Sequence, residues 1–532
     1  MKTLYVPRRG LWSSPPTSLF SLISAIEFEV PLLYTGPTMQ PRNFLLLAGG
    51  LWTMTCLAIS VPGARTVETT PTSNAPTRIA GAGVTSSPAE APSQPTLPTL
   101  SESTPSFELI GHSPLLNRGM NAALAVYGNY AYIGSRTDGS HADAGVLVVD
   151  IANPYNPQVV YQIGPPEEGL AGQTSRELRV WPEQELLLVM NLNCEVRLHD
   201  CAQVVVQADL SVYDISGANA AAPRRLLAYP LLRVPHEMFL WDDPAMSGRA
   251  LLYISTPGGY IYNVLVLDIS QARAGQLQEL GNWGAPRELV NAGLHSLSLS
   301  VDGKRAYLAH LRDGFMILDT SELAAGITNP QMQLLTPPYN WAQSSPGPHS
   351  AVKLFGKPYV LTTEEVYWAC PWAWARILDI SDETRPQFVA EYKLHPYNIA
   401  EHCADPDLEQ YINTSFSAHN PTLTKNLAFI TWHSGGLQAI AIENPLAPMQ
   451  VAEFLPEPLP AVGTEDPGLS SGPDKVVMWS YPIIKDGLIY VVDIRNGLYI
   501  LKYHGPFEEE VTAIRFLEGN SNLGEAQLWE MP

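Results

Sequence analysis

The amino-acid sequence predicts an all-β protein: a single seven-bladed β-propeller built from four-stranded antiparallel blades. The first observation is a repeat in which an apolar strand, a polar residue and a turn recur at intervals of roughly 50 to 65 residues. Five copies end the strand with Asp, at Asp150, Asp214, Asp268, Asp319 and Asp379. Two further copies, in residues 436–445 and 497–506, carry Ala441 and Lys502 in that place.

The second observation is an apolar or aromatic strand before each copy, such as residues 130–133 and 427–430. The third is a strand that often follows the Asp turn, as in residues 158–163, 387–392 and 449–454. With an inner strand added, four strands in each of about seven units indicate a propeller. We expect each repeat Asp to accept backbone N–H groups in its own turn, because Asp caps its chain locally.

The chain in order predicts one large domain after an N-terminal extension. Residues 107–111 resemble an outer strand that joins the last blade and closes the ring, which removes an exposed sheet edge. The expected boundaries are a leader that is untranslated or disordered (1–38), a signal peptide or N-terminal anchor (39–63), a disordered Pro/Thr/Ser-rich linker (64–105), the propeller (106–520) and a C-terminal tail (521–532).

The segment 39–63 has the composition of a secretory signal. Arg42 supplies positive charge, and residues 44–60 are apolar without a charged side chain. We therefore expect an exported protein that is extracellular or lies at the cell surface, with membrane contact only through this segment. The net charge of −21 disfavours nucleic acid as a partner, because nucleic-acid binding needs a basic surface.

Four cysteines follow this segment, and an even number in an exported chain predicts disulfides. Cys194 and Cys201 are close in the sequence, whereas Cys370 and Cys403 lie in two insertions around the fifth blade. We expect the pairs 194–201 and 370–403.

Histidines carry the strongest chemical signal. At the inner strand of blades three to six stand His236, His295, His349 and His419. Blades one, two and seven offer Asn121, Arg176 and Ser480 in the same place. The innermost strands line the central channel, so equivalent positions form an arc around one mouth.

Two interpretations of this arc remain open. Imidazoles that converge suit a divalent transition metal such as Zn, Cu, Fe or Ni. Alternatively each His caps its own strand, and duplication has copied it from blade to blade. Because four positions spread over half a ring are far apart, three His with Glu365 or water are the expected ligands for one metal.

The repeat resembles that of LVIVD-repeat propellers, with Val146–Asp150 and Val264–Asp268 as close variants of the name motif. The His-Asn pair at His419 and residues 432–436 are also similar to propellers of the choice-of-anchor-B type. That resemblance implies an acidic pair at Glu364 and Glu365, with Glu365 as the candidate carboxylate ligand.

Other residues near this rim have a structural alternative. His310 and His433 stand at the ends of the second strands of blades four and six. We expect them to lie behind the candidate metal ligands, near the same rim of the channel. Trp368, Trp372 and Trp374 lie in the insertion of blade five. They either line a pocket or pack around the expected disulfide.

The resemblance specifies fold better than function. One hypothesis is a binding scaffold whose loops contact a protein, carbohydrate or small molecule. The other is a metal-dependent enzyme, such as an oxidoreductase, with a site at the channel mouth. The sequence has no nucleotide-binding loop, and the Gly-x-Ser-x-Gly spacing at residues 468–472 lies between two prolines and not in the strand-to-helix elbow of serine hydrolases.

Overall fold

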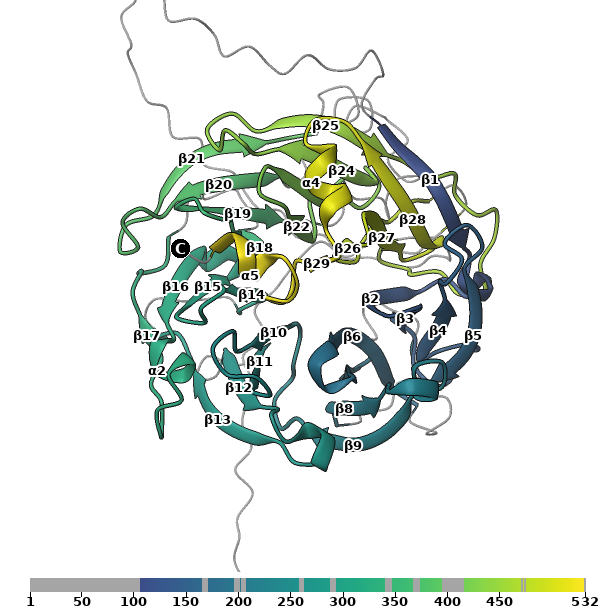
Figure 1. The fold of residues 1–532 in the computed structure, drawn as a ribbon, viewed down its shortest axis with the longest axis horizontal. Coiled ribbons are helices and arrows are strands. Elements are labelled where there is room, and N and C mark those ends of the chain that lie inside the picture. The colour runs from purple at the N-terminus through teal and green to yellow at the C-terminus, as the bar shows by residue number, and fades with distance from the viewer. Residues whose placement is uncertain are drawn as a thin grey trace, which may run out of the picture. The chain divides into compact units, whose positions relative to one another are not determined.

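The strands form where apolar and β-branched residues alternate or run together between turn residues. A computed structural model describes residues 106–164, 171–195, 201, 207–257, 263–287, 293–339, 347–366, 374–394, 416–469, 472 and 475–530. Within them seven antiparallel sheets follow one another around a central channel, and this confirms the predicted seven-bladed propeller (Figure 1).

Each of the first six blades is a four-stranded meander whose consecutive strands pair. Blade one comprises β2 (Asn121–Tyr127), β3 (Tyr130–Ser135), β4 (Val146–Asp150) and β5 (Gln158–Ile163). Blade two comprises β6 (Gln173–Trp181), β7 (Leu186–Asn193), β8 (Asp209–Asp214) and β9 (Arg224–Pro230). Blade three comprises β10 (Met238–Asp242), β11 (Ala250–Ser255), β12 (Val264–Asp268) and β13 (Gln278–Trp283).

The next three blades repeat this order. Blade four comprises β14 (Ser296–Leu299), β15 (Arg305–Ala309), β16 (Phe315–Asp319) and β17 (Gln333–Leu334). Blade five comprises β18 (Pro348–Lys353), β19 (Tyr359–Glu364), β20 (Ala375–Asp379) and β21 (Gln387–Tyr392). Blade six comprises β22 (Pro421–Leu423), β23 (Leu427–Thr431), β24 (Leu437–Ala441) and β25 (Met449–Phe454).

Blade seven closes the ring with strands from both ends of the domain. It contains β26 (Ile483–Lys485), β27 (Leu488–Asp493) and β28 (Gly497–His504). The predicted closing strand is β1 (Ser106–Ser113), which pairs antiparallel with β28 as the outermost strand. An additional inner strand, β29 (Phe516–Glu518), pairs with β26. The ring therefore has no interruption between its first and last blades.

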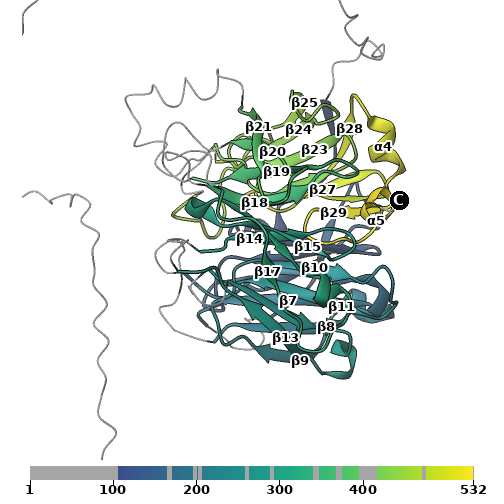
Figure 2. The ribbon, with the colours of Figure 1, turned by 90° about the vertical axis from the view of Figure 1, so that its left-hand side faces the viewer.

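The C-terminal segment crosses the channel. After α4 (Glu508–Ala513), β29 leads into a stretch whose Ser521 forms a parallel bridge with Leu240 of β10. The side chain of Asn522 accepts from the Asp242 N–H at 2.8 Å and donates to the Asp242 carbonyl at 2.7 Å. α5 (Ala526–Glu530) follows, and α4, β29 and α5 lie on one face of the ring (Figure 2). Residues from 521 onward, expected as a tail, therefore join blades seven and three.

The core lies between neighbouring blades, where the apolar faces of their sheets meet. Between blades two and three, for example, Trp181, Met190, Leu240 and Leu252 pack together and are buried. The short α2 (Ser321–Ala324) completes the described helices outside 3-10 turns. In the described part of the chain, no helix has the length and apolar character needed to cross a membrane.

A disulfide joins Cys194 to Cys201, and this confirms the first predicted pair. Cys370 and Cys403 lie outside the described residues, as do the expected leader, signal or anchor and linker of residues 1–105.

All five repeat Asp side chains cap their own turns. Each accepts the backbone N–H of the residue two positions later, at 2.8–3.0 Å. The predicted structural role of this Asp is therefore observed in every blade that has it.

Asp268→Ala tests the strength of this cap, because Ser270 N–H would lose its acceptor while little else changes. We expect a loss of about 1 kcal/mol in the free energy of unfolding, as for other local caps. Asp268→Asn, which keeps an acceptor oxygen, should retain most of that stability. Chemical denaturation of the three proteins measures the difference, and equal stability of Asp268→Ala and wild type would contradict the assignment.

Candidate metal centre

Four imidazoles from four consecutive blades meet at one end of the channel. The ring centroids of His236 and His295 are 4.3 Å apart, those of His295 and His349 are 3.7 Å apart, and those of His349 and His419 are 4.4 Å apart. His349 and His419 are almost completely buried, and His295 retains 13% of its side-chain exposure. The structure thus brings the four predicted His side chains into one continuous row.

Backbone pairing at the start of each inner strand fixes this row. The N–H of His236 bonds to the Ser255 carbonyl at 2.9 Å, and those of His295 and His419 make the equivalent bonds at 2.9 and 2.8 Å. His349 instead lies at a bulge in the pairing of β18 with β19. A bulge re-aims a side chain, which here turns His349 into the channel.

Hydroxyl groups tie His295, His349 and His419 to the preceding blade. Ser255 of blade three donates to the His295 carbonyl at 2.7 Å, and Ser296 of blade four donates to the His349 carbonyl at 2.5 Å. Thr363 of blade five donates in the same way to the His419 carbonyl. These bonds set the position of one His relative to the next.

Glu365 supplies a carboxylate to the same cluster. Its Oε2 lies 3.3 Å from His349 Nε2, and its Oε1 lies 3.4 Å from His419 Nε2. His433 Nε2 is 3.1 Å from Oε1. Oε1 is therefore close enough to accept a hydrogen bond from His433. One ligand atom each from His349, Glu365 and His419 can be chosen with all separations within 4.8 Å, which is compatible with a shared metal.

Burial disfavours the protonated form of the four imidazoles. Desolvation, followed by the charge of neighbouring imidazoles, lowers the pKa of His236 and His349 well below its usual value. Burial likewise lowers the pKa of His419, and it lowers that of His295 to about 4. Burial alone would raise the pKa of Glu365, but the adjacent His349 and His419 hold it well below its usual range. Neutral imidazoles beside a carboxylate are the protonation states that metal binding requires.

A second carboxylate lies deeper in the channel. Glu237 Oε1 is 3.7 Å from His295 Nδ1, and Glu237 Oε2 is 3.2 Å from the Tyr481 hydroxyl. Burial, with the charge of Glu177, raises the pKa of Glu237 well above its usual value. Glu237 was not a candidate from the sequence, where its one signal is its position directly after the candidate ligand His236.

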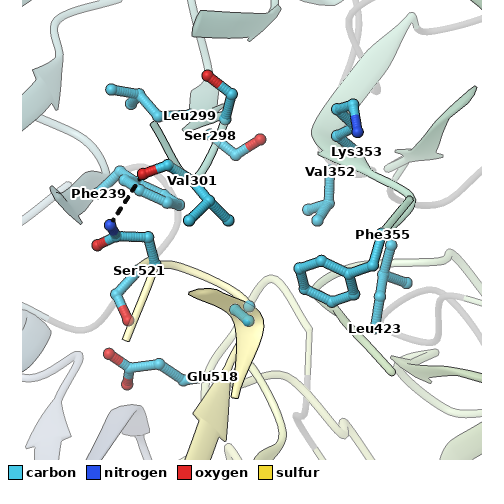
Figure 3. A pocket seen from close by; sticks show the side chains of 14 residues that line it. Phe239, Ser298, Leu299, Val301, Val352, Lys353, Phe355, Leu423, Glu518 and Ser521 are labelled. Carbon is cyan, nitrogen blue, oxygen red and sulfur yellow. Dashed lines mark hydrogen bonds between the residues drawn. The ribbon is translucent and has the colours of Figure 1, made fainter. Parts of the chain in front are cut away.

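The C-terminal segment closes the channel behind these groups. Leu240 follows His236 by four residues, which places it roughly 13 Å further along the strand. Its N–H donates to the Asn520 carbonyl. A Cβ on Gly519 would overlap the Pro421 carbonyl oxygen, so the segment passes close against β22. Between the segment and the inner strands remains a narrow cavity of about 30 Å³ (Figure 3). That volume suits one or two water molecules, and the His cluster faces the other mouth.

Comparison with models of protein families identifies a known repeat in this chain. A model of the LVIVD repeat matches residues 118–163 and 295–327, which correspond to blade one and to the first three strands of blade four. This chain carries LVIVD repeats. Comparison with curated proteins finds no match. The second match begins at His295, so the LVIVD unit of blade four includes the inner-strand position that faces the channel.

Blades two and seven place different side chains at the level of the His row. Arg176 of blade two occupies a bulge like that of His349, and its guanidinium lies 5.9 Å from the Trp479 ring. In blade seven the equivalent residue is Trp479, one position before the predicted Ser480, because Thr431 donates to the Trp479 carbonyl at 3.2 Å. The alignment by sequence was therefore shifted by one residue in that blade.

The remaining sequence candidates separate into two groups. His433 contacts Glu365, as described above, whereas His310 bonds to Asp313 in its own turn at 3.1 Å. Trp374 packs against the charged groups of Arg376 and Lys393. Trp368 and Trp372 lie outside the described residues.

Glu364, the other half of the acidic pair, points away from the cluster. Its Oε1 accepts from Arg376 Nε at 2.7 Å, and both side chains are buried. Arg376 also contacts Glu391 at 2.9 Å. Glu364 is therefore a structural ion-pair partner.

Glu364→Ala and Glu365→Ala should consequently have different effects. Removing Glu364 leaves a buried guanidinium with one carboxylate partner fewer, so we expect about 3 kcal/mol lower stability, near the lower end for a broken buried pair. Glu365→Ala should change metal content more than stability. Thermal unfolding and metal analysis of both variants check this, and a metal loss as large in Glu364→Ala as in Glu365→Ala would refute the division of roles.

Proposed function

We propose that this protein is a metal-dependent enzyme whose divalent transition metal ion is held at one end of the propeller channel by His349, Glu365 and His419. The supporting geometry is a buried set of two imidazoles and one carboxylate from three different strands or loops. Three protein ligands leave a coordination position open, as catalytic sites require.

The tautomer of His419 carries the proposal. Its Nδ1 lies 2.7 Å from the Trp479 carbonyl oxygen, which can only accept, so Nδ1 bears the proton. In the neutral imidazole Nε2 then has a lone pair, and this lone pair faces Glu365 Oε1 at 3.4 Å. Two buried acceptors this close repel each other unless a proton or a metal ion lies between them, and burial disfavours the proton by lowering the pKa of His419 well below its usual value. A metal ion bound by both removes that conflict.

The separations of the donor atoms fit such an ion. Two ligands at about 2.0–2.2 Å from a tetrahedral metal are about 3.3–3.6 Å apart. Glu365 Oε2 lies 3.3 Å from His349 Nε2, and the other carboxylate oxygen, Oε1, lies 3.4 Å from His419 Nε2. Imidazole and carboxylate ligands suit Zn, Fe, Cu and Ni. When bound, the ion supplies Lewis-acid or redox chemistry at the open mouth of the channel.

The protein residues have separate tasks in this site. His349, His419 and Glu365 hold the ion, while the Trp479 carbonyl orients His419 through Nδ1. The C-terminal segment excludes solvent from the rear. A substrate therefore approaches from the mouth on which the imidazoles lie.

A scaffold role remains the second proposal. The propeller fold supports it, and the loop that leads into His236 exposes two apolar side chains beside the channel, with Leu232 90% and Val234 59% exposed. Apolar side chains that are exposed together favour contact with a protein, carbohydrate or other partner. This role does not require a metal.

His349→Ala and His419→Ala, made singly, test the metal site. Each substitution removes a proposed ligand. We expect metal affinity to fall by more than about 100-fold, because loss of a residue that only hydrogen-bonds to a ligand already lowers metal affinity about 10–100-fold. His310→Ala removes a buried His outside the cluster and is the matched control. Metal analysis and thermal unfolding measure the outcome, and metal-free wild type purified after metal-replete expression would leave only the scaffold proposal.

We also propose export from the cytoplasm. Arg42 with the apolar residues 44–60 supports a signal or anchor, and the Cys194–Cys201 disulfide suits an oxidising compartment. Fractionation of cells that express the full chain should recover it outside the cytoplasm with this disulfide formed. Cytoplasmic protein that keeps residues 39–60 and has free thiols at these positions would oppose export.

A further inference from the structure

The mouth of the channel opposite the His row contains a second, larger pocket. It has a volume of about 400 Å³ and lies between the C-terminal segment and the far ends of the inner strands of blades seven, one, two and three. In Figure 1 the C-terminal segment, drawn in yellow, passes to one side of β2 and β6. Asp242, which lines the pocket, follows His236 by six residues and so lies roughly 20 Å further along the strand. Cavities of this size hold small ligands.

One wall of this pocket is apolar and fixed in place. Four apolar or aromatic side chains line the pocket: Val126, Tyr127, Phe516 and Leu523. The Glu525 carboxylate accepts the N–H groups of Arg515 and Phe516 at 2.9 and 3.0 Å. Gly524 has a φ of +73°, and a Cβ there would overlap the Phe516 carbonyl oxygen. The turn that carries Phe516 and Leu523 is therefore held tightly, so its apolar surface is ready for a ligand without rearrangement.

Charged side chains lie at two separate ends of the pocket. Glu183 follows the inner strand of blade two, and Asp242 ends that of blade three. Lys485 ends β26 of blade seven, and Arg515 precedes β29, which pairs with β26. Blade one separates the acidic residues from the basic residues in the ring. The pocket is therefore negative at one end and positive at the other.

Asp242 is the available acceptor at the negative end. Its Oδ1 accepts from Trp181 Nε1 at 3.0 Å, whereas Oδ2 accepts no hydrogen bond from the described residues. Both oxygens of Glu183 already accept bonds from the loop after β10. Burial, with the charges of Glu183 and Asp243, raises the pKa of Asp242 to about 6. A cationic ligand group beside Oδ2 would stabilise the ionised carboxylate.

Arg515 is the available donor at the positive end. Its side chain is exposed, and its guanidinium makes no hydrogen bond or ion pair with the part of the chain that the structure describes. The Lys485 ammonium instead contacts the Asp486 carboxylate. A guanidinium can bind a carboxylate through two parallel hydrogen bonds.

We propose that this pocket binds a short peptide with free termini, its N-terminal ammonium at Asp242 and its C-terminal carboxylate at Arg515. Apolar side chains of the peptide pack against Phe516 and Leu523. The Gln527 amide, which also lines the pocket, can both donate to and accept from a peptide group. Two or three extended residues place the two termini roughly 7–10 Å apart, so they can reach separate ends. This inference does not depend on the proposed metal site, which lies at the other mouth.

Modified tripeptides test the two charged contacts. Isothermal titration calorimetry compares alanyl-leucyl-alanine with its N-acetylated and its C-terminally amidated forms, each added to the purified full-length chain. We expect the free tripeptide to bind and each modified form to bind at least about tenfold more weakly, because each loses one charge-assisted hydrogen bond. Equal affinity for all three forms would contradict recognition of the termini.

Two variants assign each terminus to its residue. Asp242→Asn keeps an oxygen for Trp181, and it should weaken binding of the free tripeptide about tenfold without further weakening that of the N-acetylated form. Arg515→Gln should do the same for the free and the amidated forms. Arg385→Gln is the matched control, because this Arg is 80% exposed and lies in the turn before β21, outside the pocket. It should bind as wild type does.

The outcomes for the pocket and for the metal site are distinguishable. Wild type that binds no free tripeptide at millimolar concentration, or binding that both Asp242→Asn and Arg515→Gln leave unchanged, would overturn the peptide site. Thermal unfolding verifies that each variant is folded, and metal content should be equal in all of them. Metal-free protein that binds the tripeptide as expected would refute the proposed metal site alone and support the peptide site.

Discussion

The bond from a hydroxyl group of one blade to the inner-strand carbonyl of the next determines the geometry of the channel. It recurs from Ser255 to His295, from Thr363 to His419 and from Thr431 to Trp479. Each bond lies at the same strand position, so successive blades keep the same height along the channel. Without this alignment the four imidazoles would still lie on inner strands, but at different heights along the channel.

Closure of the ring turns that local alignment into a site. Because β1 pairs with β28, the seven blades have a defined circumference. The C-terminal segment then connects blade seven to blade three through β26 and β10. This segment links the inner strands across the channel and makes the rear of the His row inaccessible. The polar groups of the cluster are therefore buried even though they line a channel.

The fold was predictable because its signals are local and repeated. The Asp that ends the third strand caps a turn two residues away, and this bond needs no distant partner, as at Asp150 and Asp319. The C-terminal segment was expected as a tail because its partners are far away in the sequence. Asn522 bonds to Asp242, 280 positions earlier, and no periodic pattern marks that contact.

The site was predictable in its residues more than in its geometry. Equivalent strand positions identified the four His, but bulges decide which side chain enters the channel. The bulge at His349 cannot be seen in the sequence, and Ser480 was chosen over Trp479 in blade seven because alternation alone does not fix the register. Glu364 and Glu365 are adjacent, so one faces Arg376 while the other faces the imidazoles.

One observation favours the metal interpretation over duplication of a structural His. A His that only caps its surroundings needs one nitrogen, and Nδ1 of His419 meets that need at the Trp479 carbonyl. Its Nε2 is left facing Glu365, which stands two residues after Thr363 just as His433 stands two residues after Thr431. Blades five and six thus carry different residues, Glu365 and His433, at one equivalent position. Both side chains belong to the same cluster as His419. Copying would preserve the residue type, whereas imidazoles and a carboxylate together can serve as ligands of one metal ion.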